Sequence, residues 1–210
     1  MPSEVSGTFI ENEAIETGSQ SNKPFEMIVE VLRQAGLGRE RVDRVVIGLG
    51  PGSYTGIRAA IALAQGWQLG RGVPLQGISS AECLAAQAQS EGILGRVGVA
   101  IDAQRSEFYL ATFEISATGW QEAQPLRLVS QGTVAECEKA GALLIGPEVC
   151  RWFPQGRMVF PRAATLARLA ANRAETVRGE QLEPIYLRAT NFVKAPPPRV
   201  LPEERSPERK

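Results

Sequence analysis

The sequence predicts an α/β protein in which crossover helices connect the strands of a parallel sheet. Two short β-branched runs, at residues 45–49 and 73–78, are each followed by a helical pattern, at 57–70 and 80–90. This alternation is typical of βαβ units. The chain has 210 residues, of which 43% are hydrophobic and 22% charged, an ordinary globular composition. We therefore expect one large domain or two small lobes around a real core.

The N-terminal part of the chain predicts a hairpin over residues 5–17 and a helix from about Asn22 to Gly36. Pro24 suits the first turn of such a helix, and glycine commonly ends one. The helix has one apolar stripe of Phe25, Ile28, Leu32 and Ala35, and Met27 and Val31 add a second. Burying both stripes requires a sheet behind the helix and something else in front of it.

The next helix, predicted from about Ile57 to Gly70, has one apolar face and one nearly bare face. The apolar face holds Ile57, Ala60, Ile61, Ala64 and Trp67, and the bare face holds Ala59, Ala62, Gly66 and Gly70. Small residues let another helix approach closely. That helix could belong to the same lobe or to a partner protein. Ser79 and Glu82 have the spacing of a capping box that opens the helix at 80–90.

A new series of predicted strands and helices starts after residues 92–96, which predicts a second lobe. We expect strands at 97–102, 107–114, 126–130, 143–145 and 158–160, and an amphipathic helix at 163–176. The predicted division is an N-terminal lobe over 1–94, a C-terminal lobe over 95–190, and a disordered, proline- and charge-rich tail over 191–210. The second lobe opens with a strand that has no counterpart in the first. We therefore expect Met1 to be an internal methionine of a longer reading frame.

Charge and rare residues exclude several kinds of function. The 23 basic and 23 acidic side chains balance, which argues against binding nucleic acid through the overall field. The chain has no histidine, which excludes a histidine-based nucleophile system and imidazole-ligated metals. We expect no metal site. Three scattered cysteines predict a reducing, cytoplasmic setting, and no apolar run is long enough to predict a membrane span.

The loop at residues 50–58 joins a buried strand to a helix and is the first candidate site. Glycines at 50, 52 and 56 permit positive φ, and Ser53 or Thr55 can cap the helix. The candidate anion or nucleotide residues are Gly50, Gly52, Ser53, Thr55, Gly56 and Arg58. The alternative is a tight turn before a capped helix. Arg58 could pair with an acid across the lobe or contact a phosphate.

Asp102 is the second candidate, because it is an acid at the end of a predicted strand. Such an acid can hold a metal or polarise water. It can equally cap the hairpin turn that follows at 103–106.

Four segments, in order, closely resemble the TsaB family, also called YeaZ. They are the Gly-Pro-Gly-Ser-Tyr-Thr-Gly-Ile-Arg run at 50–58, the strand and helix start at 73–80, the Asp-Ala-Gln-Arg-Ser-Glu-Phe-Tyr run at 102–109, and Pro-Ile-Tyr-Leu-Arg at 184–188. Gln104 departs from the family pattern, which has an arginine there. The family's opening strand ending in Asp-Thr-Ser has no match in this chain.

The resemblance implies an actin-like, Hsp70-like fold of two RNase H-like lobes. It also implies a non-catalytic subunit that works with the catalytic subunit TsaD and the ATPase TsaE, and that forms a homodimer when alone. The complex forms threonylcarbamoyladenosine beside the anticodon, so contact with tRNA would be indirect. TsaD holds its metal with a pair of histidines, which this chain lacks. No cofactor is expected for the chain itself, although ATP or ADP between the lobes of the complex stays open.

In this family the first two helices of the N-terminal lobe form the interface. The predicted partner interface is therefore Met27, Val31, Ala59, Ala62 and Gly66. Two other functions stay open. One is an actin-like-fold enzyme, either a nucleotide-dependent phosphotransferase or a peptidase. The other is direct tRNA binding through arginines at 151, 157, 162, 168 and 173.

Overall fold

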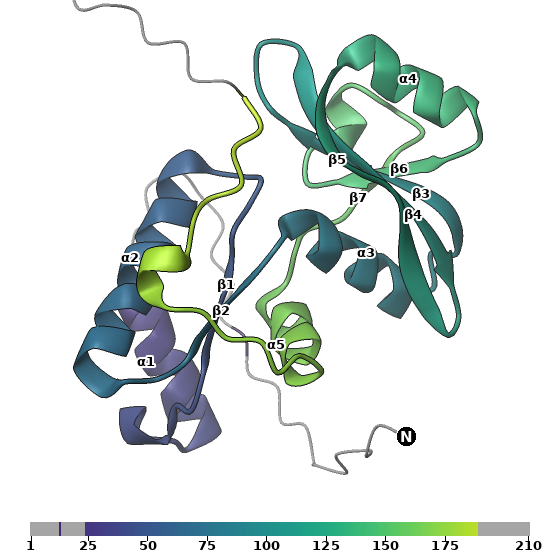
Figure 1. Ribbon diagram of the computed structural model, residues 1–210. Coiled ribbons are helices and arrows are strands. Elements are labelled where there is room, and N and C mark those ends of the chain that lie inside the picture. Colours follow the sequence, from purple (N-terminus) through teal and green to yellow (C-terminus); the bar gives the residue numbers. More distant parts are fainter. Residues whose placement is uncertain (1–12, 14–23, 189–210) are drawn as a thin grey trace, which may run out of the picture.

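The computed structural model describes residue 13 and residues 24–188, in which two sheets are connected and covered by helices (Figure 1). The order of elements is α1 (Pro24–Ala35), η1 (Arg39–Arg41), β1 (Val45–Gly48), α2 (Tyr54–Arg71), β2 (Leu75–Ile78), α3 (Ser80–Ser90), β3 (Gly95–Asp102), β4 (Glu107–Ser116), β5 (Gly119–Ser130), α4 (Gln131–Lys139), β6 (Leu143–Gly146), η2 (Val149–Arg151), β7 (Arg157–Met158), α5 (Ala163–Ala171) and η3 (Gly179–Gln181).

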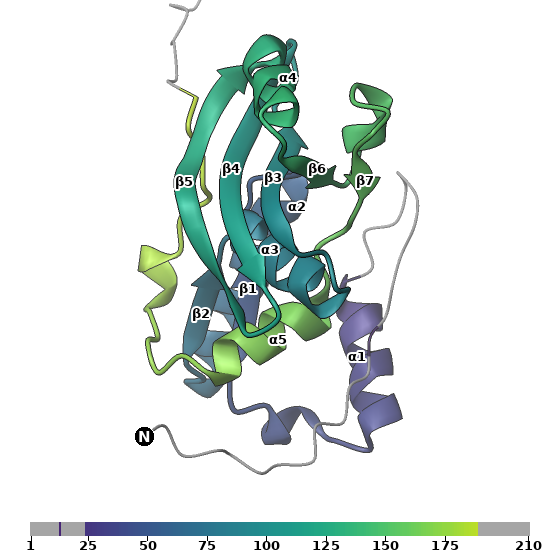
Figure 2. The ribbon, with the colours of Figure 1, turned by 90° about the vertical axis from the view of Figure 1, so that its right-hand side faces the viewer.

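The smaller sheet consists of β1 and β2, which are parallel and pair from Val45 with Leu75 to Gly48 with Ile78. The crossover helix α2 lies on one face of this sheet and α5 lies on the other (Figures 1 and 2). The core between α2 and the sheet includes Ile57, Ile61 and Leu75. The chain after α5 closes one edge of this sheet, where the Val177 amide donates to the Leu75 carbonyl at 2.8 Å.

The larger sheet has five strands in the order β5-β4-β3-β6-β7. The β3–β4 and β4–β5 pairs are antiparallel, and the β3–β6 and β6–β7 pairs are parallel. One face packs against α3, through residues such as Leu84 and Phe113. The other face packs against α4 and η2, where Phe108 and Val134 are fully buried. Helix α3 thus follows β2 directly in the chain but shares its core with the five-stranded sheet (Figure 2).

Capping residues set the helix boundaries much as the sequence predicts. Helix α1 ends at Gly36, whose φ is +66°, and α2 begins after Ser53, whose hydroxyl accepts from the Gly56 amide. Ser79 caps α3 by accepting from the Ala81 amide. The predicted capping box is only half formed, because the Glu82 carboxylate pairs with Arg173 at 3.3 Å instead.

Several predicted elements in the second half differ from the structure. The strand predicted at 126–130 begins at Gly119, and the strand predicted at 158–160 is limited to Arg157–Met158. Helix α5, predicted to reach 176, ends at Ala171. There the Arg44 guanidinium donates to the Ala170 and Arg173 carbonyl oxygens at 3.0 and 3.1 Å. In a longer helix these oxygens would accept hydrogen bonds from backbone amides of the next turn. Helix α4 was not predicted.

The predicted hairpin at 5–17 lies outside the described residues, apart from residue 13, and so does the tail at 191–210. The division between residues 94 and 95 stays a prediction. No described helix combines the length and apolar character that crossing a membrane requires.

Candidate functional site, a groove between two helices

Helix α1 contributes no fully buried residue, although it is strongly amphipathic. Phe25 is 67% exposed and Val29 is 45% exposed. Large apolar side chains gain about 1.5–3 kcal/mol each when they are buried. An apolar helix face left open by the described chain is therefore a surface that burial against another element would stabilise.

Helix α2 is buried on one side only. Ile57, Ile61 and Ala64 lie in the core, while Ala59, Ala62 and Gly66 are exposed. The faces differ because positions 57, 61 and 64 follow the spacing of one helical stripe, which the β1–β2 sheet covers. The exposed face is the bare one that the sequence predicts.

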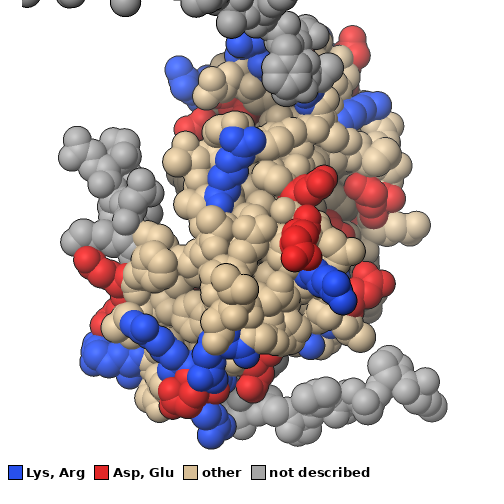
Figure 3. Space-filling model, turned by 60° about the vertical axis from the view of Figure 1, so that its left-hand side comes forward, with Lys and Arg blue, Asp and Glu red and all other residues tan. Residues whose placement is uncertain are grey.

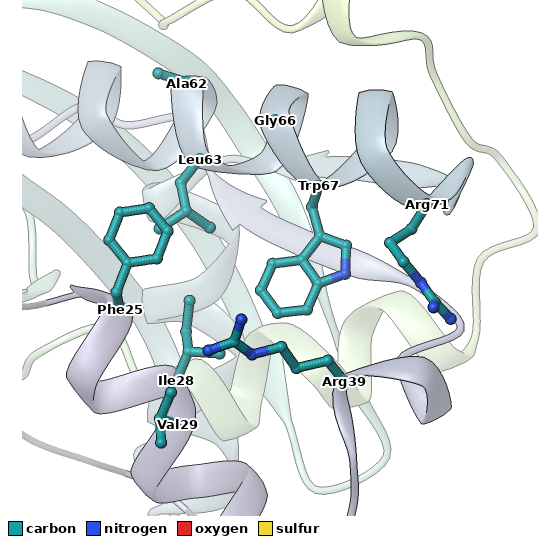
Figure 4. A pocket seen from close by; sticks show the side chains of 9 residues that line it. All are labelled: Phe25, Ile28, Val29, Arg39, Ala62, Leu63, Gly66, Trp67 and Arg71. Carbon is teal, nitrogen blue, oxygen red and sulfur yellow. The ribbon is translucent and has the colours of Figure 1, made fainter.

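An open groove of about 470 Å³ lies between α1 and α2. The lining side chains from α1 and α2 are mainly apolar: Phe25, Ile28, Val29, Ala62, Leu63, Gly66 and Trp67. Figure 4 shows Phe25 and Ile28 of α1 pointing across to Leu63 and Trp67 of α2. We call these residues, together with Arg39 and Arg71, the helix-pair groove.

The two arginines add donors to one end of the groove. Arg71 donates to the Glu40 carbonyl at 3.1 Å, and Arg39 extends between the helices below Trp67 (Figure 4). The Trp67 indole Nε1 is buried and has no hydrogen-bond partner among the described residues. Buried N–H groups normally have an acceptor. The groove thus combines apolar walls with the exposed guanidinium groups of Arg39 and Arg71, which favour a carbonyl or carboxylate.

The side of the molecule on which α2 lies has a wide central area without charged side chains (Figure 3). Lys and Arg gather toward the lower left of this view together with some acidic side chains, and further acidic side chains lie to the right. Protein interfaces often have an uncharged centre and a polar rim.

The helix-pair groove only partly matches the predicted interface. Ala62 and Gly66 line it. Ala59 is exposed on α2 but lies outside the lining, and Met27 and Val31 are half-buried on another side of α1. The sequence reasoning missed Phe25, Val29, Leu63 and Trp67 as lining residues. The first stripe of α1 was a usable signal, since Phe25 and Ile28 belong to it, but periodicity alone does not say which stripe faces the protein.

In the candidate loop at 50–58, only Gly50 among the three glycines has a positive φ, at +91°. Gly52 and Gly56 do not use the freedom that the sequence suggested. Ser53 caps α2, with its hydroxyl accepting from the Gly56 amide at 3.2 Å, and Thr55 lies exposed in the first turn. An anion or nucleotide at this loop stays a prediction.

Arg58 contacts two aromatic rings, and its contact with a phosphate stays a prediction. Its guanidinium lies 3.9 Å from the ring centre of Tyr54 and also donates to the Tyr54 hydroxyl. Tyr54 in turn stacks on Tyr186, with ring centres 5.5 Å apart. Such a position over a ring face is favourable for a cation.

Asp102 acts locally in the turn after β3, where its carboxylate accepts from the Gln104 amide at 2.7 Å. This is the capping alternative. Among residue 13 and residues 24–188, no group of three or more acidic, cysteine or histidine side chains is placed to hold an ion.

Two sheets linked by crossing helices define an α/β protein with the actin-like fold of two RNase H-like lobes, as the sequence predicts. The chain belongs to the TsaD family, whose model, described as tRNA N6-adenosine threonylcarbamoyltransferase, matches residues 21–180.

Relatives and solved structures agree with this assignment. The chain is 28% identical over 179 residues to the tRNA threonylcarbamoyladenosine biosynthesis protein TsaB of Escherichia coli, covering 77% of this chain and 78% of that protein. It is 39% identical over 93 residues to TsaB of Haemophilus influenzae, covering 44% and 39% of the two chains. A crystal structure from Pseudomonas aeruginosa, described as similar to peptidase YEAZ, matches with 30% identity and a TM-score of 0.67, over 78% of this chain and 82% of that one. The resemblance to TsaB is confirmed.

Proposed function

We propose that this chain is a non-catalytic partner subunit in the formation of threonylcarbamoyladenosine beside the anticodon of tRNA. Its relatives named TsaB carry that pathway in their names. The single observation that carries the docking role is the helix-pair groove, an apolar surface that the described residues leave open.

The partner we propose for the groove is a TsaD-like catalytic subunit. A second actin-like chain has equivalent amphipathic helices, so two helix pairs can pack side by side and bury Phe25 and Val29. Ala62 and Gly66 allow close approach because neither has a bulky side chain. When this partner is absent, a second copy of the chain can occupy the same surface, which gives a homodimer. A TsaE-like ATPase would join the complex elsewhere.

This role places the protein in the cytoplasm and makes its contact with tRNA indirect. The balanced charge of the chain supports that, since 23 basic and 23 acidic side chains give no strong attraction for phosphates. A nucleotide between the lobes of the complex would be held together with the partner, because Ser53 and Arg58 are already engaged within this chain.

The test is complex formation with the TsaD-like subunit encoded in the same genome, measured by light scattering and calorimetry. Ala62→Arg puts a charged, bulky side chain into the groove and should weaken binding about a hundredfold or more. The matched control is Ala167→Arg, which makes the same change at an exposed alanine of α5 and should leave binding unchanged.

Circular dichroism and melting of both variants check that they fold. Unchanged binding of Ala62→Arg would refute the groove as the docking site. Turnover by the isolated, purified chain would refute the non-catalytic role.

A further inference from the structure

The segment 184–188 crosses from the two-stranded sheet to the five-stranded sheet, and we call it the C-terminal strap. At its start, the Ile185 amide donates to the Leu49 carbonyl just after β1, at 2.9 Å. The Tyr186 ring stacks on Tyr54 in the first turn of α2, with an angle of 29° between the rings. The first half of the strap is therefore attached to the β1–α2 unit.

The end of the strap is attached to the other sheet through one side chain. The Arg188 guanidinium donates to the Ala103 and Gln104 carbonyl oxygens at 3.0 and 3.3 Å. It also donates to the Glu107 carboxylate at 2.5 Å. These three acceptors all belong to the turn between β3 and β4 or to its edge. Figure 1 shows the strap rising from beside α2 toward this end of the larger sheet.

The turn that Arg188 binds is strained. Gln104, Arg105 and Ser106 have φ values of 62°, 59° and 60°. Three consecutive non-glycine residues in the left-handed region are unusual, because the Cβ of each crowds the backbone. Such a conformation persists only where the surroundings enforce it.

Several hydrogen bonds from nearby in the chain also hold the turn. The Glu107 amide donates to the Gln104 carbonyl at 3.1 Å, and the Gln131 amide at the start of α4 donates to the Ser106 carbonyl at 3.3 Å. Asp102 accepts from the Gln104 amide at 2.7 Å, and the Ala103 amide donates to the Glu107 carbonyl at 2.9 Å. Arg188 adds contacts from a segment more than 80 residues away in the chain. The Arg188 and Glu107 side chains are 31% and 41% exposed, so water can reach the contact and it can open without unfolding either sheet.

We propose that the C-terminal strap is a latch that fixes the position of the two sheets relative to each other, with Arg188 as the positioning residue that closes it. While Arg188 binds the turn, the strained backbone and the Tyr54–Tyr186 stack are held together. When it releases, the turn relaxes and the two sheets gain freedom to move. This inference does not depend on the proposed docking function.

Amide hydrogen exchange of the full chain tests whether the latch exists. Arg188→Gln removes the charged donor, so we expect exchange at the Ala103 and Ile185 amides to become about tenfold faster, the effect of losing a charge-assisted hydrogen bond. The matched control is Arg105→Gln, which removes an exposed arginine from the same turn and should change neither amide.

A double-mutant cycle separates the latch from a general charge effect. Glu107→Gln should accelerate exchange less than Arg188→Gln, because the two carbonyl contacts remain. In the Arg188→Gln background, Glu107→Gln should add nothing further. An unchanged exchange rate of the Ile185 amide in Arg188→Gln would overturn the latch. So would a double variant whose exchange rate rises by the product of the two single increases.

The distance between two spin labels reports the relative position of the sheets directly. The labels are attached at Glu122→Cys on β5 and Glu175→Cys beyond α5, in a chain whose Cys137 and Cys150 are replaced by Ser. We expect one narrow distance distribution with Arg188 present and a broader one in Arg188→Gln. Equal widths would overturn the proposal. If Arg188→Gln does not fold, Arg188→Lys, which keeps the charge but loses the fork of donors, should give a broader distribution than the chain with Arg188, and an equal width would overturn the proposal.

Discussion

Arg44, just before β1, donates to the carbonyl oxygen of Ala170 in α5 at 3.0 Å, although 126 residues separate them in the chain. The same guanidinium nitrogen also reaches the Arg173 carbonyl and the Gln76 side chain. A positive charge at a helix C-terminus is favourable and satisfies carbonyls that the helix leaves free. Arg44 therefore connects the returning helix α5 to the sheet on which it packs.

Replacing Arg44 should loosen this connection. For Arg44→Gln we expect the free energy of unfolding to fall by about 1–2 kcal/mol, since the helix end loses its charged donor. Urea denaturation measures it. Arg41→Gln changes an exposed arginine that binds no helix carbonyl among the described residues, and it should change stability by less than about 0.5 kcal/mol. Equal effects of the two substitutions would contradict the role assigned to Arg44.

Glu13 should make stability depend on pH in the acidic range. The hydrogen bond from Arg162 lowers the pKa of Glu13 below its usual value of 4.5, and the Ala164 amide assists. A carboxyl whose pKa is lower in the folded state stabilises the fold above its unfolded pKa, and this contribution disappears as the pH falls through the folded value.

The stability difference between the natural chain and Glu13→Gln should therefore be present at pH 7 and shrink below about pH 4.5. Chemical denaturation across this range measures it. Glu122→Gln, on the exposed edge strand β5, serves as the control. A difference that stays constant from pH 7 to pH 3 would show that the Glu13–Arg162 contact contributes nothing through ionisation.

Gly146 in β6 lies against the backbone of β3 with no room for a side chain. A Cβ built at this position would lie 2.0 Å from the Ala100 carbonyl oxygen. Because backbone cannot move aside as a side-chain rotamer does, Gly146→Ala should destabilise the protein by about 3 kcal/mol. Gly119→Ala, where nothing lies within 4 Å, is the matched control. Thermal unfolding of both variants checks this, and similar melting temperatures would contradict the packing described.

The cysteines should differ in reactivity. Burial raises the pKa of the Cys83 thiol to about 11, so at pH 8 about one molecule in a thousand carries the thiolate. Cys150 is exposed. Alkylation with iodoacetamide, followed by mass spectrometry, should modify Cys150 first and Cys83 only after denaturant is added. Modification of Cys83 at a comparable rate in native protein would contradict its burial.

Local signals predicted much of the secondary structure. Gly36 ends α1, Ser53 and Ser79 cap the next two helices, and the β-branched runs form β1 and β2. These features depend on neighbours within a few residues, which a sequence displays directly. Helix α4 was not predicted because its sequence is mostly polar. Val134 is its one buried residue, and one apolar position does not give a periodic pattern.

The residues that line the groove could not be chosen from the sequence, for a related reason. The sequence showed two apolar stripes on α1 and a bare face on α2, but the choice between stripes depends on what packs against each. The structure places Phe25 and Ile28, rather than Met27 and Val31, along the helix-pair groove.

By itself, the sequence determined most of the helix and strand segments, the family and the lack of imidazole chemistry, because these depend on residue types and short spacings. Only the tertiary structure decided which sheet each helix covers, and that Tyr54, Tyr186 and Arg188 act together with the turn at Glu107. Those contacts join residues more than 80 positions apart. They form because packing the two sheets brings distant segments together, and no local preference of the chain encodes that proximity.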